Sequence, residues 1–167
     1  MHRIALIDGP NMSNLGARNQ RVYGSVNSLS DLQEFTKQIG HELGVEVETF
    51  ASNYEGAILE FIHESAERVE AYIINPAGLT TIGEPTRHAL EETGLPHVEV
   101  HFANIVAPPT APRGLPGGPW ESRFSRTATG VTMGLRQYSY AGALLALTMA
   151  LDDPDFLGAI KSSTESS

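Results

Sequence analysis

Short β-rich runs alternate along this chain with amphipathic helical stretches. Four runs are typical of buried strands: 3–8 (RIALID), 45–51 (VEVETFA), 71–75 (AYIIN) and 97–102 (HVEVHF). Residues 129–134 (TGVTMG) would form a short fifth strand. Helical patterns lie between or after them, at about 28–43, 55–68, 85–93 and 137–151. This order predicts an α/β fold in which a parallel sheet carries helices on both faces and ligands bind at the carboxyl ends of the strands.

The length and composition of the chain are those of one folded domain. It has 167 residues, of which 41% are hydrophobic, and this is enough to bury a full core. We expect a single domain over residues 1–157. Residues 158–167 are largely polar and low in complexity, and we expect them to form a disordered tail.

Charge and residue types exclude several partners and chemistries. The 20 acidic residues outnumber the 11 basic ones, and the net charge of −9 argues against nucleic acid or an anionic membrane as the main partner. The chain has no cysteine, which excludes disulfides, thiolate metal sites and cysteine nucleophiles. No apolar run approaches ~20 residues, and the first residues lead directly into a strand. We therefore expect a cytoplasmic protein whose main partners are small molecules or other proteins.

Residues 9–24, GPNMSNLGARNQRVYG, form a Gly-punctuated loop directly after the first predicted strand. A buried strand that opens into such a loop is a common position for an α/β active site. A phenol normally titrates near ~10, so a tyrosine acts as a base at neutral pH only beside a cation. Tyr23 has Arg18 in the same loop. The pair predicts a catalytic base, and the alternative is a surface loop with a packing tyrosine.

A second unusual segment, residues 107–119 (APPTAPRGLPGGP), is rich in proline and glycine. This composition excludes both a helix and a central strand. We expect a loop here, which is either a lid over the site or a surface connection without function.

The chain lacks the residues that Schiff-base, nucleotide-dependent and metal-dependent chemistry require. The lysines are Lys37, on an amphipathic helix, and Lys161, in the tail, and neither is well placed to form a Schiff base. Gly-rich dinucleotide-binding and P-loop motifs are absent, so we expect no cofactor. We also expect no metal site, because the histidines other than His101 lack a ligand-like arrangement: His2, His41, His63, His88 and His97.

Five blocks of residues follow one another in a characteristic order. They are Asp8-Gly9-Pro10-Asn11 with Leu15-Gly16, Arg18 and Tyr23-Gly24; Ser52-Asn53 with Glu55-Gly56 and His63; Asn75-Pro76-Ala77-Gly78-Leu79-Thr80; Glu99-Val100-His101 with Asn104-Ile105; and Ala128-Thr129-Gly130-Val131. From about residue 3 to residue 151 the chain resembles the type II 3-dehydroquinate dehydratase family. The resemblance implies a flavodoxin-like fold, a three-layer α/β/α sandwich with a five-stranded parallel sheet, and a homo-oligomer of trimers packed into a dodecamer.

The resemblance also implies catalytic roles. The family removes a proton beside a ketone, forms an enolate, and expels a β-hydroxyl as water. Tyr23 matches the general base, and Arg18 matches the cation that holds it as a phenolate. Asn11 matches the group that stabilises the enolate oxygen, and His101 matches the acid that protonates the leaving hydroxyl. Glu99, two residues earlier on the same strand, is expected to orient that imidazole.

The chain departs from the family where the substrate is recognised. Thr81 lies in a segment that the family reads as THTS, and the altered segment lacks that histidine and serine. Phe102 and Ala103 replace a hydrophobic residue and a serine that binds the substrate carboxylate. His88 replaces an aspartate that in the family lies near a neighbouring subunit's site.

A run that supplies substrate-binding arginines in the family is replaced here by residues 108–112 (PPTAP). Arg113, Arg123 and Arg126 follow closely and could substitute for those arginines. By match or by replacement, the residues that we expect to bind substrate are Asn75, Gly78, Thr81, His88, Phe102, Ala103 and Arg113.

The resemblance therefore implies a cofactor-independent hydro-lyase of the shikimate or quinate pathway. It would eliminate water from a cyclic β-hydroxy ketone, with 3-dehydroquinate or a related cyclic keto acid as its substrate. Because the recognition residues differ, two alternatives stay open. The same tyrosine and histidine could catalyse isomerisation, hydrolysis or decarboxylation of another substrate, or the scaffold could serve as a non-catalytic binding or assembly protein.

Overall fold

A computed structural model of the protein describes residues 1–24 and 26–158. The strands of this part are β1 (Arg3–Asp8), β2 (Glu46–Ala51), β3 (Ala71–Asn75), β4 (His97–His101) and β5 (Gly130–Met133). Its α-helices are α1 (Gln20–Tyr23), α2 (Leu29–Glu42), α3 (Glu55–Ser65), α4 (Glu84–Glu92) and α5 (Tyr138–Asp152). Short 3-10 helices are η1 (Met12–Ala17), η2 (Ala77–Leu79) and η3 (Phe124–Arg126). The tail expected over 158–167 lies, apart from Gly158, outside the described residues.

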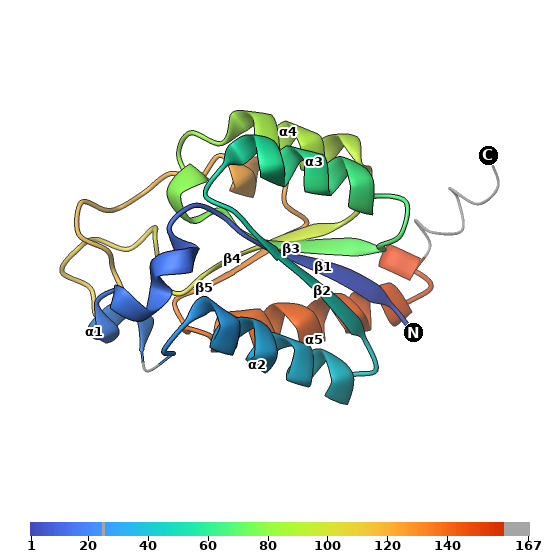
Figure 1. The fold of residues 1–167 in the computed structure, drawn as a ribbon, viewed down its shortest axis with the longest axis horizontal. Coiled ribbons are helices and arrows are strands. Elements are labelled where there is room, and N and C mark those ends of the chain that lie inside the picture. The colour runs from blue at the N-terminus through green and yellow to red at the C-terminus, as the bar shows by residue number, and fades with distance from the viewer. Residues whose placement is uncertain (25, 159–167) are drawn as a thin grey trace.

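The five strands form one parallel sheet in the order β2-β1-β3-β4-β5. Helices α3 and α4 cover one face of the sheet, and α2 and α5 cover the other (Figure 1). This is the doubly wound, flavodoxin-like arrangement, so the predicted three-layer α/β/α fold is confirmed. The strand order reverses between β1 and β3, and the crevice at such a reversal is where open α/β sheets bind ligands.

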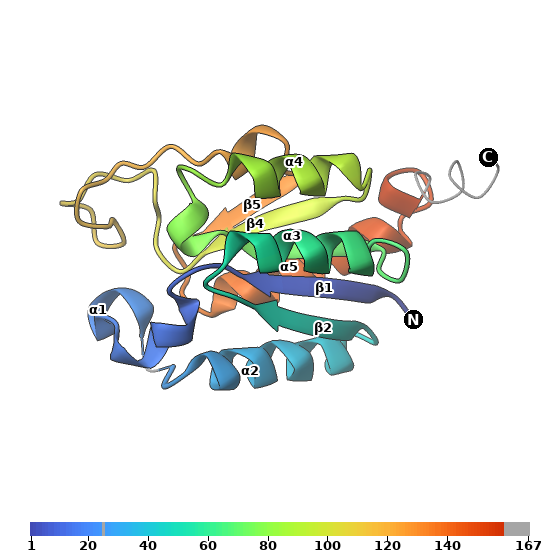
Figure 2. The same cartoon turned by 45° about the horizontal axis from the view of Figure 1, so that its top comes forward.

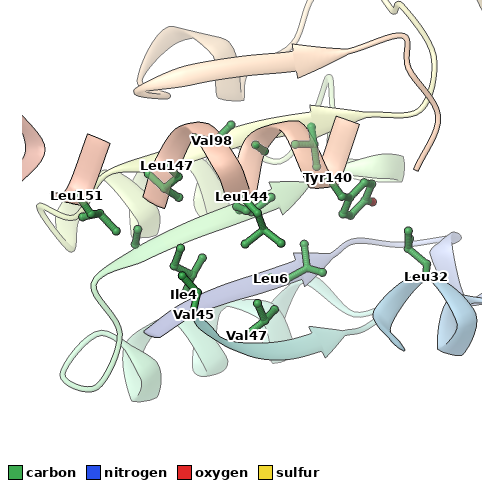
Figure 3. Packing of buried hydrophobic residues seen from close by; sticks show 14 of the residues in the cluster. Ile4, Leu6, Leu32, Val45, Val47, Val98, Tyr140, Leu144, Leu147 and Leu151 are labelled. Atoms are coloured by element: carbon green, nitrogen blue, oxygen red, sulfur yellow. The ribbon is translucent and has the colours of Figure 1, made fainter. Parts of the chain in front are cut away.

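The two-residue period of the strands distributes apolar side chains to both faces of the sheet. In β1, Ile4 and Leu6 join the core on the α2 and α5 side, whereas Ala5 and Ile7 join the core under α3 and α4. Figure 3 shows the first of these cores, with Leu144 of α5 directed toward the strands. Because both faces are covered, the strands carry almost continuous apolar runs, and this is why they can be recognised in the sequence.

The longer helices begin and end close to their predicted positions. The side chain of Ser28 caps α2 by accepting a hydrogen bond from the backbone N–H of Asp31 at 3.0 Å. Gly44 follows the helix with a φ of 71°, a left-handed conformation that favours glycine. Helix α3 is shorter than predicted, since it ends at Ser65 instead of residue 68. None of the helices in residues 1–24 and 26–158 is long and apolar enough to cross a membrane.

The connections at the carboxyl ends of the strands gather at one end of the molecule. The segment 9–24, which contains η1 and α1, lies at this end, and so does the Pro-rich loop 107–119 (Figure 2, yellow to orange). The sequence predicts both segments only as loops. Helices as short as α1 and η1 are not visible in the sequence, because fewer than two turns show no helical period.

Candidate active site

A cavity of about 240 Å³ opens at the carboxyl ends of β1, β3 and β4, three neighbouring strands of the sheet. Its polar lining comes from Arg18, Tyr23, Asn75, Thr80, Thr81 and His101, and Ala77 and Gly78 contribute next to β3. Its apolar lining comes from Met12, Phe102, Ala103, Ile105, Leu115 and Trp120. Most residues that the sequence predicts to bind substrate or to transfer protons therefore line one cavity.

Arg18 and Tyr23 form a direct pair in this cavity. Arg18 Nη2 donates to the Tyr23 hydroxyl at 2.5 Å, and the Arg18 Cζ atom lies 4.0 Å from the centre of the tyrosine ring. Asn19 caps the short helix α1 between them by accepting from the backbone N–H of Arg21 at 2.9 Å. A cation that donates to a phenol oxygen stabilises the ionised phenolate, so this pair is suited to proton abstraction.

His101 is held by a buried carboxylate. Residues two apart on a strand share a face, and His101 Nε2 bonds to Glu99 Oε1 at 2.7 Å. The Ser125 hydroxyl donates to the other oxygen, Glu99 Oε2, at 2.5 Å. Burial acts to raise the pKa of Glu99, but hydrogen bonds from His101, Ser122 and Ser125 outweigh it, so the pKa lies below its ordinary value. Glu99 is thus an ionised group that fixes the orientation of the imidazole.

Asn75 is the first residue of a buried series of hydrogen bonds that the sequence does not predict. Its Nδ2 donates to the Tyr140 hydroxyl at 2.8 Å, and that hydroxyl donates to Asp8 Oδ1 at 2.6 Å. Its Oδ1 accepts from the backbone N–H of Ala77 at 3.0 Å. Both the nitrogen and the oxygen of the side-chain amide are therefore hydrogen-bonded, and these bonds fix the orientation of the Asn75 side chain at the cavity. The sequence feature that could have indicated this network is Asp8, an acidic residue at the end of an otherwise apolar strand.

Burial dominates the chemistry of Asp8. The side chain is fully buried, and burial raises its pKa from 3.8 to about 7, although the hydrogen bond from Tyr140 acts in the opposite direction. The second carboxylate oxygen, Oδ2, has no hydrogen-bond partner among the described residues. Asp8, which contacts the cavity-lining Asn75 through Tyr140, therefore has a pKa close to neutral pH.

Asn11 lies at the edge of the cavity and is not one of its lining residues. Its backbone is left-handed, with a φ of 78°, and its N–H donates to Asn53 Oδ1 at 2.9 Å. A Cβ placed on Gly78, which does line the cavity, would lie 3.3 Å from Asn11 Nδ2. The Asn11 amide is thus a direct neighbour of Gly78, a residue of the cavity lining.

Arg113 is outside the cavity, because its donors are used elsewhere. Its guanidinium donates to the carbonyl oxygens of Arg21, Val22, Phe102 and Gly134, at 2.6 to 3.0 Å. This arginine connects the Pro-rich loop to the segment that carries Tyr23 and to the ends of β4 and β5. The structure therefore does not bring Arg113 into this cavity, where substrate binding is expected of it, and its hydrogen bonds connect separate segments of the chain.

The other two candidate arginines do not line the cavity either. Arg123 Nε donates to the carbonyl oxygen of Thr81 at 3.2 Å, and Arg126 pairs with Glu121 at 3.2 Å. His88 lies on α4 with a 60% exposed side chain, 3.7 Å from Glu92 and away from the cavity lining. In the single chain, none of these side chains replaces the arginines that the sequence lacks.

The cavity is also lined by residues that the sequence does not predict to be part of the site. Leu115 comes from the Pro-rich loop, Trp120 follows it, and Ile105 precedes it. The one tryptophan of the chain directly follows the Pro-rich loop in the sequence, and this position could have indicated that the loop lies at the site. The loop is thus part of the cavity wall, so it is more than a surface connection.

Comparisons with known proteins agree with this arrangement. The sequence profile of the family described as dehydroquinase class II matches residues 2–148. The catabolic 3-dehydroquinase of Podospora anserina is 37% identical over 155 residues, covering 85% of this chain and 91% of that protein. The 3-dehydroquinate dehydratase of Bacillus cereus is 35% identical over 147 residues, covering 88% and 95%.

A solved structure shows the same fold. The type II dehydroquinase from Propionibacterium acnes superposes with a TM-score of 0.77 at 30% identity, covering 89% of this chain and 97% of that one. The family profile spans most of the chain and includes the segments that carry Arg18, Tyr23, Asn75, Glu99 and His101. The chain therefore belongs to the class II dehydroquinase family.

Proposed function

We propose that this protein is a hydro-lyase that eliminates water from a cyclic β-hydroxy ketone, either 3-dehydroquinate or a closely related compound. The observation that carries the proposal is a single cavity that contains both a cation-paired tyrosine and a carboxylate-oriented histidine. Relatives named as dehydroquinases favour dehydration over isomerisation, hydrolysis or decarboxylation. Family membership also supports a catalytic protein over a binding scaffold.

In the proposed reaction, the Tyr23 phenolate takes a proton from the carbon beside the ketone. The electron pair moves to the ketone oxygen and forms an enolate. We expect the Asn11 amide, a neighbour of the cavity-lining Gly78, to stabilise this enolate. The enolate then re-forms the ketone and expels the β-hydroxyl, which takes a proton from His101 and leaves as water. Arg18 stabilises the phenolate before the first step, and Glu99 orients the imidazole for the last one.

We assign substrate binding to the lining residues around these groups. Asn75 offers an amide that buried partners hold in one orientation, and Gly78 gives a ring close access to the backbone. Thr81 supplies a hydroxyl, and Phe102 and Ala103 supply contact area beside His101. No group in this set requires a cofactor.

The test is a dehydration assay with purified protein. We expect 3-dehydroquinate or another cyclic β-hydroxy ketone to yield an enone, followed by its ultraviolet absorbance. Tyr23→Phe, which removes the base, should lower kcat by about 10²- to 10⁴-fold. Tyr138→Phe makes the same change at a half-exposed tyrosine outside the cavity and should leave kcat unchanged. Enone formation that survives Tyr23→Phe, or no enone from any such ketone, would reject the proposal.

We further propose that the protein works in the cytoplasm as a dodecamer built from trimers. Family membership supports the assembly, and so do large apolar side chains that the single chain leaves exposed, including Tyr54, Ile82 and Met149. Light scattering coupled to size-exclusion chromatography measures the assembly. A monomer at micromolar concentration would contradict it.

A further inference from the structure

A second hollow lies beside the segment that carries Tyr23, apart from the catalytic cavity. It has a volume of about 430 Å³ and is lined by Arg21 of α1, by Arg113 of the Pro-rich loop, and by residues 134–136 and Tyr138 after β5. None of these residues lines the catalytic cavity. Arginines from three separate segments of the chain, the third being Arg136, therefore share one hollow.

The three arginines of this hollow have no carboxylate partner among the residues that the structure describes. The arginines that form ion pairs in that part of the chain are Arg3, Arg68, Arg87 and Arg126. Residues 9–30 and 100–151 contain six arginines and one acidic residue, Glu121, although the chain has 20 acidic residues. Glu121 already pairs with Arg126. The hollow thus carries positive charge that no described carboxylate neutralises, on a chain that is acidic as a whole.

Two of these arginines lie close enough for their charges to repel each other. Arg113 is fixed by the bonds that it donates to the carbonyls of Gly134 at 2.9 Å and Arg21 at 3.0 Å. The backbone of Arg136 is left-handed, with a φ of 51°, and its N–H donates to the carbonyl of Phe102 at 3.1 Å. Burial, and next the positive charge of Arg136, lower the pKa of Arg113. A bound anion would offset this repulsion.

The hollow adjoins the end of the segment that carries the proposed base. A Cβ placed on Gly24 would lie 2.8 Å from Arg136 Nη1, so the Arg136 side chain lies against the residue that follows Tyr23. Arg21 belongs to α1, the helix that ends at Tyr23. An ion held by Arg21 and Arg136 together would therefore connect the Tyr23 segment to the residues after β5.

We propose that this hollow binds a doubly charged, phosphate-type oxyanion, and that the bound ion restrains the Tyr23 segment. Guanidinium groups bind such oxyanions through paired, charge-assisted hydrogen bonds. Two negative charges suit the hollow better than one, because three arginines line it. The inference goes beyond the dehydratase function, since it concerns a separate site whose ligand is not the substrate.

Calorimetric titration of the full chain with inorganic phosphate, at pH 8 and constant ionic strength set with chloride, tests the site. We expect saturable binding to one site. Arg136→Met should weaken this binding by about tenfold or more, because charge-assisted hydrogen bonds are lost, and Arg136→Lys should have a smaller effect. Arg126→Met is the matched control at an arginine that pairs with Glu121, and should leave the affinity unchanged. No saturable binding, or equal affinity in Arg136→Met, overturns the inference.

Arg18→Met separates this hollow from the catalytic cavity, which Arg18 lines. Phosphate binding that survives Arg18→Met and weakens in Arg136→Met supports the inference. The opposite pattern would place the ion in the catalytic cavity and overturn it. Arg21→Met changes an exposed residue of the hollow and should also weaken binding, so the test does not depend on how well Arg136→Met folds.

Amide hydrogen exchange, measured by mass spectrometry, tests the effect on the Tyr23 segment. Saturating phosphate should slow exchange in residues 19–24 of the unaltered protein and should not do so in Arg136→Met. Unchanged exchange in the unaltered protein would overturn the proposed restraint. Neither measurement requires turnover, so a failed dehydration assay does not affect this inference. Failure to bind phosphate likewise leaves the dehydratase function in place.

Discussion

At the residue scale, Asp8 links the stability of the protein to pH. Its folded-state pKa of about 7 lies above the ordinary value of 3.8, so the folded chain holds this proton more tightly than the unfolded chain does. The stabilising effect of the bound proton is fully present below the ordinary value. It is lost as the pH rises through about 7, and above that pH the ionised carboxylate destabilises the fold.

Asp8→Asn should remove this dependence. A carboxamide can still accept the Tyr140 hydrogen bond through Oδ1, but it never ionises. We expect the variant to gain unfolding free energy at pH 8, by at most about 4 kcal/mol for a shift of about three pKa units. At pH 4 it should gain little. Urea denaturation at both pH values measures this, with the exposed Asp155→Asn as the control, and equal gains at the two pH values would contradict it.

In the proposed mechanism Glu99 is a positioning residue, because it would act on substrate only through His101. In Glu99→Gln the amide oxygen can still accept from the imidazole, but the charge that favours the bond is gone. We expect kcat to fall by about 10- to 100-fold with little change in KM. Steady-state kinetics check this against Glu121→Gln, whose side chain is 85% exposed and pairs with Arg126. A rise in KM at constant kcat would assign Glu99 to substrate binding instead.

At the element scale, Arg113 joins the Pro-rich loop to the segment that carries Tyr23. In Arg113→Met the hydrogen bonds to the carbonyls of Arg21 and Val22 are lost. We expect faster amide hydrogen exchange in residues 107–119 and in residues 19–24, measured by mass spectrometry. We also expect kcat/KM to fall by about tenfold, because a misplaced base is costly.

Arg126→Met is the matched control, since Arg126 pairs with the exposed Glu121 at the protein surface. Unchanged exchange in both segments of Arg113→Met would mean that other contacts hold the loop. Faster exchange in the loop alone would mean that the Tyr23 segment is held independently.

The strands and long helices could be predicted because each repeats a local pattern. Ile4 and Leu6 alternate with Ala5 and Ile7, and this period is visible without any neighbouring element. The short helices around Tyr23 have no such period. The course of the Pro-rich loop depends on Arg113 reaching carbonyls about 90 residues away in the sequence, as in its bond to Val22, and no local pattern encodes that.

The residues of the candidate site also fall into those that local motifs predict and those that depend on how distant segments fold together. Arg18, Tyr23 and His101 were predicted from their motifs, because strand ends of a parallel sheet gather at one edge. Leu115 and Trp120 were not, because their contribution depends on how the loop folds back over the cavity. The hydroxyl of Tyr140 was missed because α5 reads as a continuous apolar helix in which a tyrosine looks like core.

At the scale of the whole molecule, two separate cores hold the sheet. Leu144 is fully buried in the core between α5 and the strands, so Leu144→Ala should lower the unfolding free energy by about 2 to 5 kcal/mol. The next residue, Leu145, is 48% exposed, and Leu145→Ala should change it by less than about 1 kcal/mol. Chemical denaturation of the pair measures the difference, and similar losses would indicate that subunit contacts bury Leu145.

The strand order has a consequence for synthesis on the ribosome. Because the sheet order is β2-β1-β3-β4-β5, each strand after the first adds to an edge that earlier residues have already formed. Tyr140 follows Asp8 by 132 residues, so at about 5 to 20 residues per second it is made roughly 7 to 26 s later. The nascent chain can thus pair β1 to β4 before α5 supplies the hydroxyl that holds Asn75, and we expect a complete site only once the last helix has been made.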